Sequence, residues 1–203
     1  MNSAKDIPEI PNLSDDYIRA RADEARSKCC GESAYLFSFN VDEMVENLGL
    51  QIIPLPNLLS EFNIDGFLNY PDREIVVDES AYDSIDQWTR LRFTVAHEIG
   101  HFMLHSDFFS KLDFRTMQEW AEVYLKIDGH TKLEEQANEF AGRFLVPREH
   151  LELMITEEKE RIVNRTGVDL QRILATRIAK KMLVSSVVVD IRFRVEKLMH
   201  LIR

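Results

Sequence analysis

The chain has 203 residues, of which 45% are hydrophobic and 30% are charged, and its formal net charge is -10. It contains only 7 glycines and 6 prolines. This composition excludes a disordered or fibrous protein and indicates a helix-rich globular chain of one domain, or of one domain with a modest appendage. No stretch reaches the ~18 apolar residues of a membrane span, and the N-terminus lacks the apolar core of a signal peptide. We therefore expect a cytoplasmic protein without a membrane partner.

The first half of the chain is expected to combine helices with a small sheet. An amphipathic pattern predicts a helix over about 14–30, and a capping box formed by Asn40 and Glu43 predicts a second helix that ends at Gly49. A Pro-Asp turn separates two later apolar runs, which is typical of a β-hairpin. The expected strands cover residues 51–55, 66–70 and 75–78.

The second half of the chain is expected to be mainly helical. The predicted helices cover about 85–105, 114–126 and 132–145, with further helices toward the C-terminus. Ser84 and Gln87 fit a capping box at the start of the first of these helices. Strands followed by helices predict an α+β fold.

The run HEIGH places His97, Glu98 and His101 on the predicted helix over 85–105. Residues four apart share one face of a helix, so the two histidines can offer imidazole nitrogens to a single tetrahedral zinc ion. Glu98 lies about 100° round the helix from His97, where it can act as a base toward the attacking water. This spacing predicts metal-assisted hydrolysis.

A zinc ion in a hydrolase usually takes three protein ligands, so one more side chain is needed. Glu134 lies about 50° from the centre of the apolar side of its predicted helix, and Glu135 lies about 150° away. Glu134 is therefore the favoured ligand and Glu135 the alternative. If no metal were present, Glu134 would be a carboxylate near an apolar face without a partner. Asn138 follows Glu134 by four residues and could orient the carboxylate or a ligand imidazole.

His105 lies one further helical turn beyond His101. Its distance from His97 along the helix axis is about 12 Å, so these two histidines cannot bind the same ion. His105 could form a hydrogen bond in the cleft, stabilise an oxyanion or play an auxiliary part beside the ligands, and an ordinary role at the helix end is at least as well supported. Tyr70 and Tyr82 are further candidates for the oxyanion donor.

Two stretches of the chain resemble the ImmA/IrrE family of zinc metallopeptidases. They are RLRFTVAHEIGHFMLH (Arg90–His105) and EEQANEFAGRFLVP (Glu134–Pro147). The hairpin upstream and VSSVVVDIRFRVEKL (Val184–Leu198) are also similar to the layout of that family. The resemblance covers roughly residues 40–198, and the two motifs together are more specific than HEIGH alone.

The resemblance implies a small gluzincin-like α+β fold, with a short antiparallel or mixed sheet on the metal-binding helix and a helical C-terminal tail. It implies that His97, His101 and Glu134 bind Zn2+ and that Glu98 is the catalytic residue. It also implies that an edge strand aligns the substrate peptide by main-chain pairing, for which the hairpin over 66–78 is the candidate. Members of the family typically cleave a DNA-binding repressor or regulator, so a helix-turn-helix repressor is the expected substrate.

The chain is expected to divide into two parts. Residues 1–150 form the catalytic domain, in which about 40–150 are the core and 1–39 are an N-terminal helical segment. Residues 151–203 form a helical C-terminal subdomain that resembles a helix-turn-helix, with its turn over 180–186.

The C-terminal segment raises an alternative function. From Gln171 to Arg203 there are eight basic and two acidic residues, a surplus of six positive charges. The alternative is a non-enzymatic regulator or a toxin-antitoxin type of interaction protein, which could bind DNA through these helices. The helix expected after Ser186 begins with three valines, whereas a recognition helix needs side chains that read bases, so direct nucleic-acid binding is disfavoured. Glu98 disfavours a purely binding role, since such a role gains nothing from a base beside the metal.

Overall fold

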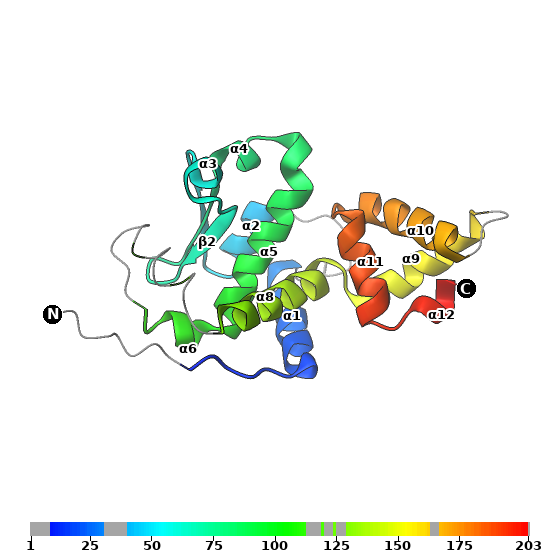
Figure 1. The fold of residues 1–203 in the computed structure, drawn as a ribbon, viewed down its shortest axis with the longest axis horizontal. Coiled ribbons are helices and arrows are strands. Elements are labelled where there is room, and N and C mark those ends of the chain that lie inside the picture. Colours follow the sequence, from blue (N-terminus) through cyan, green and yellow to red (C-terminus); the bar gives the residue numbers. More distant parts are fainter. Residues whose placement is uncertain are drawn as a thin grey trace.

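The computed structural model describes residues 9–30, 40–112, 119, 124, 129–162 and 167–202. A small three-stranded mixed sheet lies at one side of a mainly helical molecule, which confirms the predicted α+β class (Figure 1). The helix expected over 114–126 lies outside the described residues except at Glu119 and Tyr124. None of the helices in the described ranges combines the length and the apolar character that crossing a membrane requires.

The sheet consists of β1 (Gln51–Leu55), β2 (Gly66–Asn69) and β3 (Glu74–Asp78) in the order β1-β3-β2. β3 pairs with β1 in parallel and with β2 in antiparallel orientation, so the predicted hairpin is confirmed. The apolar run Ile75–Val77 is fully buried, as expected for a central strand that is covered on both faces. β2 is an edge strand of this sheet.

The N-terminal helices lie where they were predicted, but the second ends at Glu46 and not at Gly49. α1 (Asp15–Cys30) packs against the later helices through its apolar side, and α2 (Val41–Glu46) begins after Asn40. The Asn40 side chain caps α2 by accepting a hydrogen bond from the backbone N–H of Asp42. The chain then turns at Gly49, whose φ of 70° favours glycine.

Two short helices flank the sheet and have no counterpart in the predictions. They are α3 (Leu58–Phe62) and α4 (Glu79–Tyr82). The carboxylate of Asp78, at the end of β3, accepts hydrogen bonds from the backbone N–H groups of Leu59 and Ser80. One buried side chain therefore holds the starts of both helices next to the sheet.

The helix that carries HEIGH begins later than predicted. Residues Ile85–Gln87 form a 3-10 turn, and the α-helix α5 covers Trp88–Leu104. Ser84 forms no side-chain cap, so the predicted capping box is wrong. After α5 the chain continues into the short α6 (Ser106–Phe109).

The long helix α8 (His130–Leu145) packs along α5. Apolar side chains from both helices are fully buried at this contact, among them Ala96, Ile99, Phe140 and Phe144. α1 lies against α8 on another side, so α8 is held between two helices. α5 also contacts the sheet, which places the HEIGH residues between β2 and α8 (Figure 1).

The remaining helices form a group at one end of the molecule (Figure 1). They are α9 (Arg148–Glu160), α10 (Gly167–Met182), α11 (Ser186–Val195) and α12 (Met199–Ile202). The predicted turn over 180–186 is shorter in the structure because α10 continues to Met182. Leu183 has a φ of 52°, and Ser185 caps α11 by accepting a hydrogen bond from the backbone N–H of Val188.

Candidate metal centre

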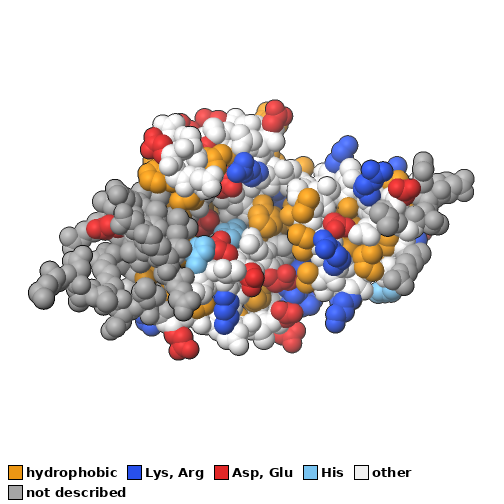
Figure 2. All heavy atoms as spheres, viewed as in Figure 1, with side chains coloured by type: hydrophobic (Ala, Val, Ile, Leu, Met, Phe, Trp, Pro, Cys, Tyr) orange, Lys and Arg blue, Asp and Glu red, His pale blue; other side chains and the backbone are white. Residues whose placement is uncertain are grey.

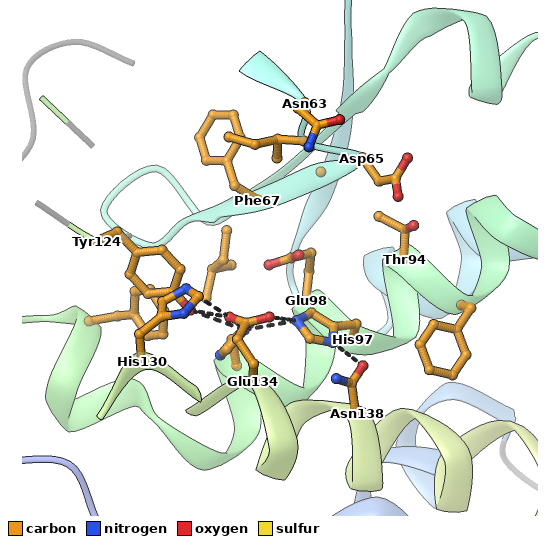
Figure 3. A pocket seen from close by; sticks show the side chains of 16 residues that line it. Asn63, Asp65, Phe67, Thr94, His97, Glu98, Tyr124, His130, Glu134 and Asn138 are labelled. Atoms are coloured by element: carbon orange, nitrogen blue, oxygen red, sulfur yellow. Dashed lines mark hydrogen bonds and ion pairs between the residues drawn. The ribbon is translucent and has the colours of Figure 1, made fainter. Parts of the chain in front are cut away.

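The side chains of His97, His101 and Glu134 converge between α5 and α8. The Nε2 atoms of the two histidines are 3.0 Å apart. The Glu134 carboxylate oxygens lie 3.1 Å from His97 Nε2 and 3.3 Å from His101 Nε2. Figure 3 shows His97, Glu98 and Glu134 meeting below β2. The structure thus brings together the three residues that the sequence indicates as metal ligands.

The donor atoms of these residues fit a zinc ion. All the candidate ligand atoms lie within 4.8 Å of one another. Neighbouring corners of a zinc tetrahedron with bonds of 2.0–2.1 Å are about 3.3 Å apart, close to the separations found here. Two imidazole nitrogens and a carboxylate that face one another with their lone pairs repel unless a cation or a proton lies between them.

The charge states of His101 and Glu134 also suit a metal. Burial lowers the pKa of His101 to about 3, so its imidazole is neutral at pH 7. Burial acts to raise the pKa of Glu134, but the contacts with His101 and His97 outweigh it and hold that pKa well below its usual range. A neutral imidazole and an ionised carboxylate are the forms that bind metal ions.

Asn138 on α8 supports the first histidine. The His97 Nδ1–H donates a hydrogen bond of 3.0 Å to the Asn138 side-chain oxygen. This bond leaves the Nε2 lone pair of His97 available for a metal. Glu135, the alternative ligand, is exposed and does not belong to the cluster of candidate ligands.

Glu98 lies beside the three candidate ligands and is almost fully buried. Its carboxylate lies near the backbone N–H of Leu68 in β2. Burial raises the pKa of Glu98 to about 7, and Glu134 adds to this effect while His97 opposes it. A carboxylate with a pKa close to neutrality can both accept and release a proton.

His105 does not line the cavity, which favours the helix-end role over the role in the cleft or as an oxyanion donor. It follows the last residue of α5 as its C-cap and is 1% exposed, behind His101. Its Nδ1 is 3.0 Å from His101 Nδ1. Tyr70 and Tyr82 are also away from the site, since Tyr70 packs on Phe102 and the Tyr82 hydroxyl donates to Asp42. None of these three residues lines the cavity.

Two residues at the site were not singled out by the sequence. The Tyr124 hydroxyl donates a hydrogen bond of 2.7 Å to Glu134 and lies 3.3 Å from His101 Nε2. His130, the first residue of α8, has its ring against Tyr124 and its Nε2 3.6 Å from Glu134. The four-residue spacing of His130 and Glu134 was a usable signal for His130. Tyr124 comes close only through the tertiary fold.

The site opens into a cavity of about 300 Å³. Residues of the β2 edge line one side, and α5 and α8 line the other (Figure 3). Histidine side chains are visible in this hollow on the molecular surface (Figure 2). The lining residues from the strand and the turn before it are Asn63, Ile64, Asp65, Gly66, Phe67 and Leu68.

The arrangement agrees with a comparison against protein families. Residues 46–194 match the Peptidase_M78 family model, which is described as an IrrE N-terminal-like domain. A comparison with curated proteins gives no match. The family match covers both α5, with HEIGH, and α8, with Glu134, and extends through α11. The chain belongs to the ImmA/IrrE family of peptidase domains.

Proposed function

We propose that the protein is a zinc-dependent endopeptidase. The observation that carries this proposal is the convergence of His97, His101 and Glu134 beside the buried carboxylate of Glu98, in a cavity that borders an edge strand. Membership of a peptidase family supports hydrolysis of a peptide bond. A purely binding protein would have no use for Glu98 next to the metal ligands.

In this proposal each polar residue has its own role. His97, His101 and Glu134 hold the metal. When bound, zinc would supply Lewis acidity, which polarises the scissile carbonyl and makes the attacking water more acidic. Glu98 takes the proton from that water and delivers it to the leaving amine. Glu98 and Leu68 both line the cavity, so this carboxylate is placed to act there.

We propose that β2 aligns the substrate. β3 occupies one side of β2, and the other side borders the cavity next to Glu98. An extended peptide could add to this edge through main-chain hydrogen bonds, which would bring its scissile bond over the metal ligands. The exposed backbone of an edge strand suits this purpose.

Tyr124 and His130 are the candidates for stabilising the oxyanion. Tyr124 and Glu134 both line the cavity (Figure 3). Among the described residues, His130 Nε2 is buried without a hydrogen-bond partner, and its ring lines the same cavity. A donor at this position can stabilise the negative charge that develops on the carbonyl oxygen.

The proposed substrate is a helix-turn-helix repressor or regulator, as in relatives of this family. A substrate of this kind would place the enzyme in the cytoplasm. The test is to incubate the protein with the repressor encoded by the adjacent reading frame. A defined cleavage product that a chelator abolishes supports the proposal, and an intact repressor under both conditions argues against it.

The proposal also divides the chain into two parts. The catalytic domain covers 1–150, with its core over 40–150, and a helix-turn-helix-like subdomain covers 151–203.

DNA binding by the C-terminal helices receives little support. Figure 2 shows basic side chains over these helices, but five of the seven basic residues that the structure describes between 171 and 202 form ion pairs within the protein. These five are Arg172, Arg177, Lys181, Arg192 and Arg194. The exposed side of α11 carries Val187, Ile191 and Val195, which cannot read base edges by hydrogen bonds.

The assignment of the third ligand has a matched control on the same helix. Glu134→Ala should remove zinc binding or weaken it strongly, because only two protein ligands remain. Glu135→Ala should bind zinc as the unchanged protein does, since this side chain is exposed and outside the cluster. Zinc content after dialysis measures both variants. Equal loss in the two variants, or loss in Glu135→Ala alone, contradicts the assignment.

A further inference from the structure

A chain of buried hydrogen bonds runs from the candidate ligand His101 to the N-terminal segment. His101 Nδ1 and His105 Nδ1 are 3.0 Å apart, and His105 Nε2 is 2.8 Å from the side-chain oxygen of Gln136. The Gln136 amide nitrogen then donates a bond of 3.0 Å to the backbone carbonyl of Pro11. We call this series from His101 to Pro11 the Pro11 relay.

The Pro11 carbonyl determines which atom donates and which accepts in each hydrogen bond of the Pro11 relay. A backbone carbonyl can only accept, so the amide nitrogen of Gln136 must face Pro11 and its oxygen must face His105. His105 therefore carries its proton on Nε2 and offers the lone pair of Nδ1. The proton between the two histidines must then lie on His101 Nδ1, which leaves the lone pair of His101 Nε2 facing His97 and Glu134.

The surroundings keep this order in place. His101, His105 and Gln136 are each at most 6% exposed, so water does not compete for their hydrogen bonds. The three side chains come from α5 and α8, and Pro11 comes from the segment before α1. Ile10 of this segment packs so closely on Gly129 that a Cβ there would lie 2.8 Å from Ile10 Cδ1. The N-terminal segment is thus fixed against the start of α8.

We propose that His105 and Gln136 are positioning residues, which act with the Pro11 carbonyl to fix the tautomer and the ring orientation of His101 for metal binding. This inference rests on the proposed function, because it assumes that the site holds zinc. It assigns to the N-terminal segment a part in building the metal centre. His97 has a simpler arrangement of the same kind, since the side-chain oxygen of Asn138 alone accepts its Nδ1–H.

The test compares two substitutions at one position. His105→Phe keeps a ring of similar size but removes the acceptor for His101, whereas His105→Asn places an amide oxygen near the former Nδ1. Zinc affinity is measured by competition with a chromogenic chelator, and the visible absorption spectrum of the cobalt-substituted protein reports the ligand geometry. We expect His105→Phe to lose about 10- to 100-fold in zinc affinity and to change the cobalt spectrum. His105→Asn should recover most of both.

Gln136→Met provides a second test that leaves both histidines in place. It removes the acceptor for His105 at nearly the same volume, so zinc affinity should fall. The same change should have a smaller effect in the His105→Asn background, because the two residues act in one series. His150→Asn, at a buried histidine of α9 that contacts Arg26 outside the metal centre, is the control and should leave zinc affinity unchanged.

The outcomes separate the inference from the proposed function. If the unchanged protein binds no zinc, the proposed function fails. If it binds zinc and the folded His105→Phe and Gln136→Met variants bind it within twofold of that affinity, the positioning role is overturned. If His105→Phe does not fold, an unchanged zinc affinity of the Gln136→Met variant is enough to overturn the positioning role. Equal losses in His105→Phe and His105→Asn also contradict it, since the amide should restore the acceptor.

Discussion

At the scale of single residues, the glycine of HEIGH explains how two helices can come close enough to share the candidate metal site. A Cβ at Gly100 would lie 3.1 Å from Phe140 Cδ1 and 3.2 Å from the backbone oxygen of Ala137. Both contacts are with α8, the helix that carries Glu134. The absence of a side chain at Gly100 therefore lets α8 approach α5 closely enough for Glu134 to reach both histidines.

Gly100→Val should separate these helices. The added side chain meets the backbone of α8, so we expect a loss of about 1–3 kcal/mol in the free energy of unfolding and weaker zinc binding. Urea unfolding and chelator competition measure the two effects. Glu135→Val places the same side chain on the exposed side of α8 and is the control. A Gly100→Val protein with unchanged stability and zinc affinity would show that the contact is not tight.

The sequence predicts most of the candidate site because its proposed ligands are set by local spacing. His97, Glu98 and His101 follow from helix periodicity, and the direction of Glu134 follows from the apolar side of α8. Asn138 was placed by the same four-residue spacing. The burial of His105 could not be predicted, because it depends on Gln136 and Pro11, which are distant in the sequence. The position of Tyr124 beside Glu134 could not be predicted for the same reason, because it depends on the tertiary fold.

At the scale of elements, the closeness of β2 to α5 determines the shape of the cavity. A Cβ at Gly66 would lie 2.8 Å from the Val76 backbone oxygen and 2.8 Å from Thr94 Cγ2. The first contact is with the neighbouring strand and the second with α5. Only glycine at position 66 therefore lets β2 lie this close to both β3 and α5, with the Leu68 N–H near Glu98.

Gly66→Ala should move β2 away from α5. We expect a lower free energy of unfolding, by about 1–3 kcal/mol, and slower cleavage, because both the substrate edge and the Glu98 contact shift. Thr94→Ser removes Cγ2, one of the two clashing atoms. The double variant Gly66→Ala, Thr94→Ser should therefore regain part of the lost stability and activity, and Thr94→Ser alone is its reference. Urea unfolding and initial cleavage rates are the measurements. Full activity and stability in Gly66→Ala would contradict this account of β2.

Long periodic elements could be predicted from the sequence, whereas short ones could not. α1, α8 and the β2-β3 hairpin agree with the predictions, because amphipathic periodicity and turn residues mark them. α3 and α4 have only five and four residues and depend on the Asp78 carboxylate, a tertiary contact. The start of α5 was wrong by three residues because Ile85–Gln87 adopts the tighter 3-10 turn.

At the scale of the whole molecule, a buried ion network joins the C-terminal helices to α8. Arg192 of α11 binds Glu139 at 2.8 Å and also pairs with Glu196. Arg143 of α8 binds the same Glu196 at 3.1 Å. The side chain of Glu196 is only 1% exposed, so its charge depends on these arginines. The network therefore connects α8, which carries Glu134, to α11.

Arg192→Ala should therefore be destabilising, by about 1–3 kcal/mol, because the buried Glu196 loses one of its charged donors and Glu139 loses another contact. Arg194→Ala on the same helix should cost at most about 1 kcal/mol, since Arg194 is exposed and pairs with Asp190 at the surface. Thermal and urea unfolding measure both. Similar stability of the two variants would mean that the network contributes little.

Removal of the metal should also act on the whole fold. Zinc would link α5 to α8 and bind only the folded chain, so at free zinc about 1,000 times the Kd it adds about 4 kcal/mol to the free energy of unfolding. A chelator should lower the Tm of the unchanged protein and leave that of His97→Ala nearly constant. Equal shifts in both proteins would show that the chelator acts elsewhere.

The most direct test of the central claim is cleavage by the Glu98→Gln variant, measured beside its zinc content. The amide keeps the size of the side chain and leaves the three ligands in place, but it cannot accept the proton. The account predicts one bound zinc ion in both proteins and a turnover at least about 100-fold lower in the variant, on the repressor that the unchanged protein cleaves. Equal cleavage by both proteins, with equal zinc content, would contradict it.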